Sequence, residues 1–312
     1  MAVKNKSKCK VCKDEFSSEK GLHLHLKKHK MDLATYYTTY YPRSNLSTGD
    51  PLPFKNKEDY FNKDFSSRAQ LIKWCMKEEE KKVKPYVLDK LKNRINLKKL
   101  SKAPNHLELR IAGLPDIDSY KHLFGSYSKA CRLVGVDPLF HQRVSKDFFE
   151  DSAKFEHLKI FIDSREQQPL SFKNSELLKL DFGDYTVGGD DYSYTYIDRK
   201  SEQDFKGTLS GGVERFRREL ERVKEFDSYL FIVIEGDISS IYKHNRWGPH
   251  KSNLSFVYHN MRVLTHEFNG HCQFVFSGSR ENSEKLIPKI LKLGKKLWHS
   301  DLQYYIDKND LD

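Results

Sequence analysis

The sequence predicts a multidomain protein with a small ββα module, an all-α middle containing a helix-turn-helix, and a C-terminal α/β domain. Three observations lead to this fold class. Two cysteines and two histidines stand close together near the start of the chain. Glycines and prolines divide residues 84–142 into short helical segments, and apolar strand-like runs alternate with helical patterns after residue 157. Such alternation is typical of an α/β domain.

The first expected domain, residues 1–34, carries a metal-binding pattern. Cys9 and Cys12 form a tight knuckle, and His25 and His29 are spaced so that both imidazoles lie on one helical face. Two thiolates and two imidazoles at these spacings suit tetrahedral zinc. A module this small has too little core to fold alone, so we expect the Zn²⁺ to be structural.

This module closely resembles the common DNA-reading zinc finger. Counted from a helix start at Glu19, the base-reading positions are Ser18, Gly21 and Leu24, of which only serine can hydrogen-bond. Lysines surround these positions and include Lys20, Lys27 and Lys28. We therefore expect the finger to hold the phosphates of double-stranded DNA without reading bases. Binding of a protein or of RNA stays open.

Residues 35–83 are expected to form a tyrosine-rich linker and a helix. Pro42, Gly49, Pro51 and Pro53 interrupt any long helix before residue 65. We interpret this stretch as a linker that wraps the surface or lies along DNA. Its tyrosines could stack on bases or act as exposed anchors, and they include Tyr36, Tyr37, Tyr40 and Tyr41.

Residues 84–142 are expected to be a helix-turn-helix domain that binds DNA. Gly113, Gly125 and Gly135 stand where left-handed helix caps are expected, so short helices would alternate with tight turns. Residues 103–136 resemble the repeat found beside homing endonucleases of phages and other mobile elements. The resemblance implies target-DNA binding through the helix surface from Asp118 to Lys121, with Lys121 as a contact. The alternative is a helical spacer that only positions the two ends.

Residues 143–156 are expected to be a linker, and residues 157–312 the α/β domain. Two acidic motifs in this domain follow extended, β-prone stretches, Leu177 to Tyr185 and Tyr192 to Ile197. Asp184 belongs to the first and Asp198 to the second, so we expect the acids on or beside adjacent strands. Because paired strands lie about 5 Å apart, two such carboxylates can hold one divalent ion.

The chemistry that this arrangement favours is phosphodiester hydrolysis. The reaction requires neutralisation of developing charge and a hydroxide near neutral pH, and carboxylate-bound Mg²⁺ or Mn²⁺ supplies both. We expect Asp184 and Asp198 to be the metal ligands. Lys200 follows Asp198 by two residues on the same strand, so it shares that face and could orient the water.

Elements on both sides of these motifs complete the expected domain. The apolar run Leu158 to Ile162 ends in a further acidic cluster, Asp163 to Glu166. A helix from Arg215 to Val223 would place guanidinium groups along a phosphate backbone, namely those of Arg215, Arg217 and Arg218. Two later runs, Tyr229 to Ile234 and Phe274 to Phe276, are expected to be strands.

The acidic motifs resemble those of the XPF-type branch of the PD-(D/E)xK nucleases, which have a restriction-endonuclease-like fold. The matching residues are Gly183-Asp184, Asp198-Arg199-Lys200, Asp204 and the run Ile162-Asp163-Ser164-Arg165-Glu166. The resemblance covers about residues 157–300. It implies a divalent-metal endonuclease core with Asp163 as a further metal-site acid, Arg199 in the catalytic set and Asp204 in support. Asp198 stands where this family usually has glutamate.

The charge of the whole chain points to a polyanionic partner. Lys and Arg number 55 against 44 Asp and Glu, which gives a net charge of +11. The 5 cysteines indicate a reducing compartment, and we see neither a signal peptide nor a transmembrane run. We expect a soluble protein beside DNA in the cytoplasm, in a nucleoid or phage-infected cell, or in a eukaryotic nucleus. Neither a membrane nor a small-molecule cofactor is expected, and a homodimer stays open.

The sequence therefore predicts a divalent-metal-dependent DNA endonuclease. The appended domains favour site-directed cutting by a homing-type or phage-encoded enzyme. One alternative is a structure-specific repair or recombination nuclease acting on forks, flaps or junctions. The other is a zinc-finger DNA-binding protein without catalysis.

Overall fold

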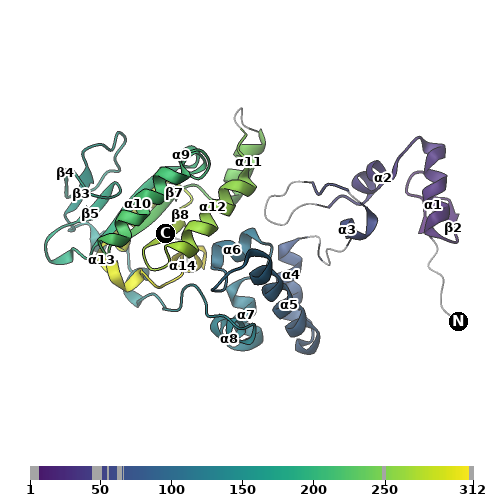
Figure 1. Ribbon diagram of the computed structural model, residues 1–312, viewed down its shortest axis with the longest axis horizontal. Helices are drawn as coiled ribbons and strands as arrows, with labels where there is room; N and C mark the ends of the chain where they lie inside the picture. The colour runs from purple at the N-terminus through teal and green to yellow at the C-terminus, as the bar shows by residue number, and fades with distance from the viewer. Residues whose placement is uncertain are drawn as a thin grey trace. The chain divides into compact units, whose positions relative to one another are not determined.

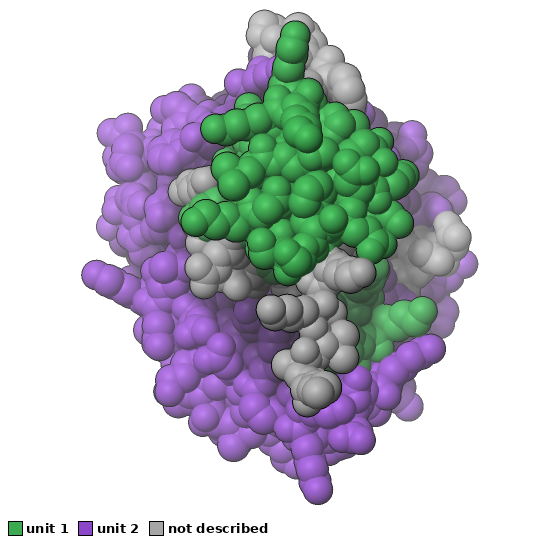
Figure 2. Space-filling model, turned by 90° about the vertical axis from the view of Figure 1, so that its right-hand side faces the viewer, with its two compact units in different colours: residues 1–74 green, residues 75–312 purple. Residues whose placement is uncertain are grey.

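The computed structural model describes residues 7–43, 51–54, 56–61, 65, 67–247 and 251–308, and Figure 1 shows its elements. The chain forms two compact units, Met1–Trp74 and Cys75–Asp312 (Figure 2). The first unit contains the expected finger and most of the tyrosine-rich segment, and the second contains the helical middle and the α/β domain. Gly49 and the first six residues lie outside the described residues. The finer division into five segments stays a prediction.

The first unit begins with two short strands and a helix. The strand β1 (Ser7–Lys8) pairs antiparallel with β2 (Glu15–Phe16). Helix α1 (Glu19–His25) follows and continues as the 3-10 turn η1 (Leu26–His29). The Ser18 hydroxyl accepts a hydrogen bond from the backbone N–H of Gly21 at 3.2 Å, which caps α1.

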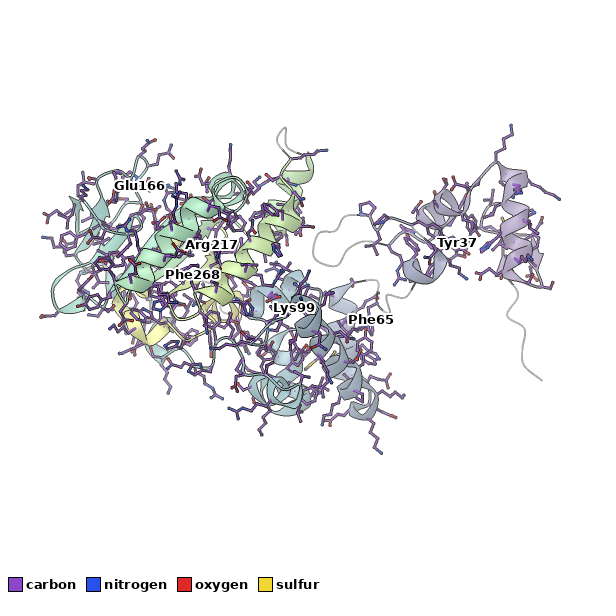
Figure 3. All side chains as sticks on the ribbon, in the orientation of Figure 1. Tyr37, Phe65, Lys99, Glu166, Arg217 and Phe268 are labelled. Carbon is purple, nitrogen blue, oxygen red and sulfur yellow. The ribbon has the colours of Figure 1, made fainter. Side chains whose placement is uncertain are left out.

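The tyrosine-rich segment packs against this module, so the prediction of exposed tyrosines in a linker is wrong for two of them. Tyr36 and Tyr37 are buried, and both lie on the short helix α2 (Leu33–Tyr40). The Tyr36 hydroxyl accepts a hydrogen bond from the backbone N–H of Lys10 at 3.0 Å. Tyr37 (Figure 3) lies 2.8 Å from the His23 ring, hydroxyl to Nε2. A further helix, α3 (Lys57–Phe61), brings Tyr60 into the same hydrophobic cluster.

One helix of 19 residues, α5, and several shorter helices make up the middle of the chain. Their bounds are α4 (Arg68–Lys77), α5 (Glu80–Lys98), α6 (His106–Ile111), α7 (Ile117–Phe124) and α8 (Tyr127–Leu133). Gly113, Gly125 and Gly135 have positive φ angles of 68°, 81° and 87°, which confirms the predicted left-handed turns after α6, α7 and α8. The helix-turn-helix itself stays a prediction.

The helix surface expected to enter a DNA groove is occupied by another part of the protein. The Tyr304 hydroxyl donates a hydrogen bond to Asp118 at 2.7 Å, and the Lys121 ammonium is bonded to the same hydroxyl. Lys308 pairs with Asp118 at 3.2 Å. Tyr304 and Lys308 both belong to α14 (Leu302–Lys308). Lys121 also forms an ion pair with Asp118 at 3.5 Å, although its side chain is exposed, so these contacts argue against Lys121 as an unpaired DNA contact.

A six-stranded mixed sheet forms the centre of the α/β domain. Its strands are β3 (Ile160–Asp163), β4 (Ser175–Leu178), β5 (Tyr185–Val187), β6 (Thr195–Ser201), β7 (Tyr229–Glu235) and β8 (Cys272–Phe276). Their order is β4-β3-β5-β6-β7-β8, and β5 is antiparallel to both of its neighbours. The other pairs are parallel. The expected strand Leu177 to Tyr185 is divided, because the chain leaves the sheet after Leu178 and returns at Tyr185 with Gly183 at positive φ.

Helices cover both faces of this sheet (Figure 1). One face carries α9 (Glu202–Thr208), α10 (Val213–Glu225) and α12 (Leu254–Glu267), and the other carries α13 (Arg280–Leu293) and α14. The strand β7 has Ile232 in the core of the first face and Phe231 in the core of the second. The remaining elements are α11 (Ile238–Trp247), η2 (Lys146–Phe149), η3 (Ser152–Phe155), η4 (Gly189–Asp191) and η5 (Gly294–Leu297).

Two further observations concern the chain as a whole. The segment 143–156, expected to be a linker, contributes Phe148 and Phe155 to the core beneath α13. Within the described ranges, no helix combines the length and the apolar character that crossing a membrane requires.

Candidate active site

A cavity of about 850 Å³ lies beside the paired strands β5 and β6, and we call it the acid pocket. Most residues that the sequence singled out in this domain for catalysis, for support of the site or for DNA binding line it. They are Asp163, Asp184, Asp198, Arg199, Asp204, Arg215 and Arg218. Four acidic side chains of the lining were not named as site residues, namely Glu166, Asp181, Glu219 and Glu235.

The chain brings Asp184 against β6 through a glycine. Gly183 has a φ of +57°, and a Cβ atom at this position would lie 2.4 Å from the carbonyl oxygen of Ile197. Only glycine fits this close approach without strain. The backbone N–H of Asp184 then donates to the Ile197 carbonyl at 2.6 Å. Asp184 and Asp198 therefore stand on neighbouring segments of one sheet, as the sequence predicts.

Strand alternation places Asp198 and Lys200 on the face covered by α10. Tyr196, two residues before Asp198, belongs to the core on that face, and Ile197 belongs to the opposite core. The Lys200 ammonium lies 3.0 Å from Oδ1 and 2.8 Å from Oδ2 of Asp198. It also lies 5.3 Å from the centre of the Phe216 ring, which belongs to α10. The predicted shared face of the acid and the base is confirmed.

The carboxylates of Asp184 and Asp198 lie close together in a largely buried part of the pocket. Burial and the neighbouring Asp198 raise the pKa of Asp184 to about 8, although its carboxylate accepts a hydrogen bond from the Arg199 backbone N–H at 2.7 Å. Burial lowers the pKa of Lys200, but the charge and hydrogen bond of Asp198 together with the charges of Asp184 and Glu219 raise it above its ordinary value. The lysine is therefore an ammonium at neutral pH, and it offsets only part of the acidic charge.

One buried oxygen in the pocket fits a metal ion. The Oδ2 atom of Asp198 is buried and has no hydrogen-bond partner, although the Lys200 ammonium is within ionic distance. A buried carboxylate oxygen left without a hydrogen bond is costly, and a hard divalent cation is a partner that it favours. Asp184 and Asp198 thus fit Mg²⁺ or Mn²⁺ as ligands, and their assignment stays a proposal.

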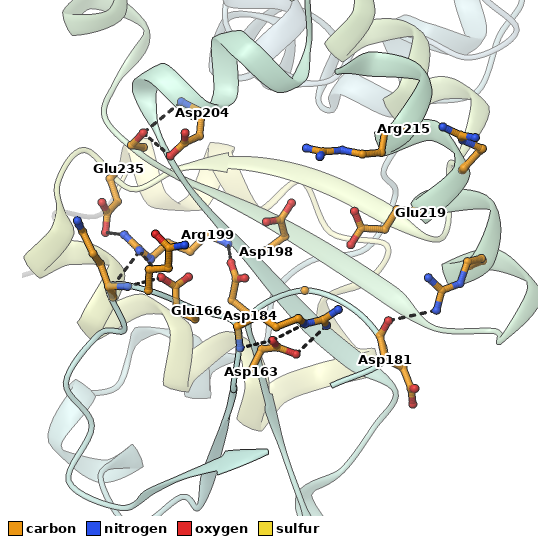
Figure 4. Close-up of a pocket in the computed structure, with 17 residues that line it drawn as sticks. Asp163, Glu166, Asp181, Asp184, Asp198, Arg199, Asp204, Arg215, Glu219 and Glu235 are labelled. Carbon is orange, nitrogen blue, oxygen red and sulfur yellow. Dashed lines mark hydrogen bonds and ion pairs between the residues drawn. The ribbon is translucent and has the colours of Figure 1, made fainter. Parts of the chain in front are cut away.

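Glu219 is a pocket acid that the sequence reasoning missed. It stands on α10, three residues after the buried Phe216, so it lies on the edge of the helix that faces the sheet. Burial and the charge of Asp198 raise its pKa, while Lys200 opposes this shift. Figure 4 shows the carboxylates of Asp184, Asp198 and Glu219 turned toward the same space. The sequence contains one signal for this position, because Glu219 follows the apolar Phe216 by three residues and so shares its side of the helix. The neighbouring arginines lead us to expect that this helix only binds phosphates.

The contacts of Asp163 argue against the metal-site role that the resemblance implies. Its carboxylate accepts hydrogen bonds from the Arg165 side chain at 2.7 and 2.8 Å, from the Arg165 backbone at 2.7 Å and from the Leu180 backbone at 2.8 Å. The Arg165 guanidinium holds the pKa of this carboxyl down to about 2. Because both oxygens are occupied, these contacts disfavour Asp163 as a metal ligand and indicate that it anchors the loop between β4 and β5.

Arg199 is paired through its side chain with two other acids of the lining and not with Asp184 or Asp198. Its guanidinium pairs with Glu166 at 3.2 Å and with Glu235 at 2.9 Å, and donates to the Gln168 carbonyl at 2.9 Å. The geometry favours the supporting role that the resemblance implies over direct catalysis. Asp204 supports the start of α9, because the Ser201 hydroxyl donates to its carboxylate at 2.6 Å.

The three arginines expected to bind DNA separate into two groups. Arg215 and Arg218 line the acid pocket, and so does Arg222 one turn beyond Arg218. Arg217, labelled in Figure 3, is not part of the pocket lining and instead forms ion pairs with Glu267 and Glu214. The position of Arg217 therefore argues against the predicted phosphate contact.

In the first unit, the predicted zinc ligands are together. The ligand atoms of Cys9, Cys12, His25 and His29 all lie within 4.8 Å of one another. Within the part of the chain that the structure describes, no other group of three or more such side chains is close enough to hold an ion as it stands, and the acids of the pocket are more widely spaced. Lysines exposed around the module include Lys20, Lys27 and Lys28.

No protein-family model matches the sequence, and no curated protein matches it. Among solved structures, the chain is similar to XPF from Aeropyrum pernix in complex with DNA, with 19% identity and a TM-score of 0.35 over 45% of this chain and 66% of that chain. It is also similar to XPF from Aeropyrum pernix, with 20% identity and a TM-score of 0.34 over 43% of this chain and 59% of that chain. The chain thus spans less than two thirds of the length of these two solved structures.

Proposed function

We propose that this protein is a divalent-metal-dependent DNA endonuclease. The observation that carries the proposal is the convergence of Asp184 and Asp198 on one cavity, with the Lys200 ammonium held against Asp198. Carboxylates this crowded repel one another unless a cation lies among them. Oxygen ligands of this kind are the ones that Mg²⁺ and Mn²⁺ prefer.

The residues of the pocket have distinct parts in this proposal. A bound divalent ion would stabilise negative charge on the phosphate and supply hydroxide near neutral pH. Asp184 and Asp198 would hold the ion, and Lys200 can donate a hydrogen bond to the attacking water or to a phosphate oxygen. Arg215 and Arg218 stand at the same cavity and can hold the scissile strand through its phosphates.

Double-stranded DNA is the partner that we propose for both units. The first unit would bind one structural zinc through its cysteines and histidines and contact phosphates with its exposed lysines. The Ser18 hydroxyl, at the one base-reading position that can hydrogen-bond, is already used as the cap of α1. We therefore propose contacts that depend on phosphates more than on sequence.

Cleavage of a supercoiled plasmid tests the function. We expect the protein to nick the plasmid in Mg²⁺, and EDTA to abolish nicking. Asp184→Asn and Asp198→Asn should lose the activity while they keep their affinity for DNA. The control is Asp190→Asn, an exposed acid outside the pocket, which should cut like the wild type. Equal cutting by the wild type and both pocket variants would show that another site is responsible, and binding without any cutting would support the non-catalytic alternative.

The choice of DNA target needs a second experiment. Site-directed, homing-type cutting predicts one preferred site in a random duplex library, whereas a structure-specific nuclease cuts forks, flaps or junctions of any sequence. The contacts of Lys121 and Ser18 disfavour two surfaces that could have read a sequence. We therefore propose the structure-specific alternative as the one to test first, with a fork and an intact duplex of matched sequence.

A further inference from the structure

The helix α10, which packs on one face of the sheet, places the side chain of Glu219 in the acid pocket. Phe216, Leu220 and Val223 of α10 are buried against the sheet, and this fixes the rotation of the helix. Glu219 stands one turn from Phe216, whose ring lies below the Lys200 ammonium at 5.3 Å. The packing that seats the helix therefore also places the Glu219 carboxylate beside the ends of Asp198 and Lys200.

Glu219 differs from most other acids of the pocket in its contacts. Asp163 is held by Arg165, and Glu166 and Glu235 are held by Arg199. Among the residues that the structure describes, Glu219 forms no ion pair, although it is partly buried. Its carboxylate faces Asp198 across the cavity (Figure 4). Asp198 carries a buried oxygen without a hydrogen bond, as Glu235 does beside Arg199. The Glu219 carboxylate accepts a hydrogen bond from the Gly183 backbone N–H, and no cationic side chain in the described ranges is paired with it. Both acids thus turn a carboxylate toward one space.

We propose that Glu219 is a third carboxylate ligand of the divalent cation, supplied by α10. This inference rests on the proposed function and deepens it, because it completes the metal site with a residue from a helix. Asp184, Asp198 and Glu219 against the single ammonium of Lys200 leave two negative charges, which one divalent cation neutralises. Mg²⁺ and Mn²⁺ use oxygen ligands, so a further carboxylate strengthens the site.

The affinity for Mn²⁺ alone tests this assignment without DNA and without catalysis. The full-length protein with zinc in its first unit would be titrated with Mn²⁺, and free Mn²⁺ measured by electron paramagnetic resonance. We expect Glu219→Gln to weaken Mn²⁺ binding by about tenfold or more. The matched control is Glu221→Gln, which removes the same charge from an exposed position on the same helix and should change the affinity by less than about twofold.

The same titration separates this inference from the proposed function. If Asp198→Asn loses Mn²⁺ binding while Glu219→Gln binds like the wild type, Glu219 is not a ligand and the proposed function stands. If the wild type binds no Mn²⁺, or Asp184→Asn and Asp198→Asn bind it unchanged, the metal site of the proposed function fails as well.

Thermal unfolding of the second unit without added Mn²⁺, with zinc kept in the first unit, addresses a purely structural role. Removal of an unpaired acid from a crowded pocket relieves repulsion, so Glu219→Gln should unfold at the same temperature as the wild type or higher. A lower unfolding temperature together with unchanged Mn²⁺ affinity would show that Glu219 supports the fold, and would overturn the proposal.

Discussion

The Lys200 ammonium lies 2.8 Å from Oδ2 of Asp198, its neighbour two residues earlier on β6. Both side chains are mostly buried, and the strand itself holds them on one face. The acid and the base are therefore positioned by backbone geometry, and their separation does not depend on a mobile loop. A metal ion at Asp198 would meet this ammonium as a close neighbour.

Replacement of Lys200 should separate catalysis from ion binding. We expect Lys200→Ala to lower kcat by about 10²-fold or more, because a general acid or base contributes about 10² to 10⁴. Its Mn²⁺ affinity should stay the same or rise, since a competing positive charge is gone. Single-turnover cleavage and Mn²⁺ titration measure the two effects. Loss of Mn²⁺ binding with the activity would mean that the lysine only supports the site.

The pairing of Asp163 with Arg165 should make stability depend on pH. The folded pKa of Asp163 is about 2, below its ordinary value of 3.8, so the stabilisation is complete above 3.8 and is lost as the pH falls through about 2. We expect Asp163→Asn to lower the free energy of unfolding by about 1–3 kcal/mol at pH 7, and by less at pH 3. Urea unfolding at both pH values checks this. An equal loss at the two pH values would contradict the ionic contribution.

Gly183 should be irreplaceable because of the carbonyl beside it. A Cβ atom there would lie 2.4 Å from the Ile197 oxygen, so Gly183→Ala must move β5 away from β6. We expect a loss of about 1–3 kcal/mol in stability, and a loss of cleavage as Asp184 shifts from Asp198. Gly189→Ala is the control, because Gly189 also has positive φ but has nothing within 4 Å of the added atom. Chemical unfolding and plasmid nicking should show a larger loss of stability and of cleavage for Gly183→Ala than for Gly189→Ala. Equal losses in the two variants would contradict the predicted clash.

Two adjacent arginines should differ in their contribution to DNA binding. Arg218 lines the acid pocket, whereas Arg217 is paired with Glu267. We expect Arg218→Ala to weaken DNA binding and to reduce the slope of log affinity against log salt by about 1. Arg217→Ala should leave that slope unchanged. Binding isotherms at several salt concentrations decide this, and the reverse order would place the DNA on the other side of α10.

The four predicted zinc ligands, Cys9, Cys12, His25 and His29, should stabilise only the first unit. Cys12→Ser should abolish zinc binding and unfold the ββα module, while thermal unfolding of the second unit stays unchanged. Val11→Ala, in the same knuckle, should keep its zinc. Zinc content and cleavage of a short duplex at saturating protein concentration measure both effects. Cleavage lost at saturation would show that the units are not independent.

The strand β6 and several helix ends could be predicted because they depend on the local sequence pattern. Alternation along β6 placed Asp198 and Lys200 on one face, and the run from Tyr229 gave the central strand β7. The three glycine caps of the middle helices also follow from local geometry, since a left-handed turn favours glycine. These features require no knowledge of what packs against them.

The remaining features depend on partners distant in the sequence. Tyr36 and Tyr37 look like linker residues until the finger core that buries them is known. Lys121 looks like an unpaired DNA contact until its bond to Tyr304 of α14 is known. The sequence favours Asp163 as a site acid and gives no role to Glu219. In the part of the fold that the structure describes, Asp163 is paired with Arg165, whereas Glu219 has no such ion pair.

The location of a bound ion is the most direct test of the central claim that Asp184 and Asp198 form a metal site. Crystals of the full-length protein soaked in Mn²⁺ would be measured at the manganese absorption edge. We predict an anomalous peak between the carboxylates of Asp184 and Asp198, within about 2.0–2.4 Å of their oxygens. Crystals with no peak in the acid pocket at saturating Mn²⁺, or with the ion bound elsewhere, would contradict the claim.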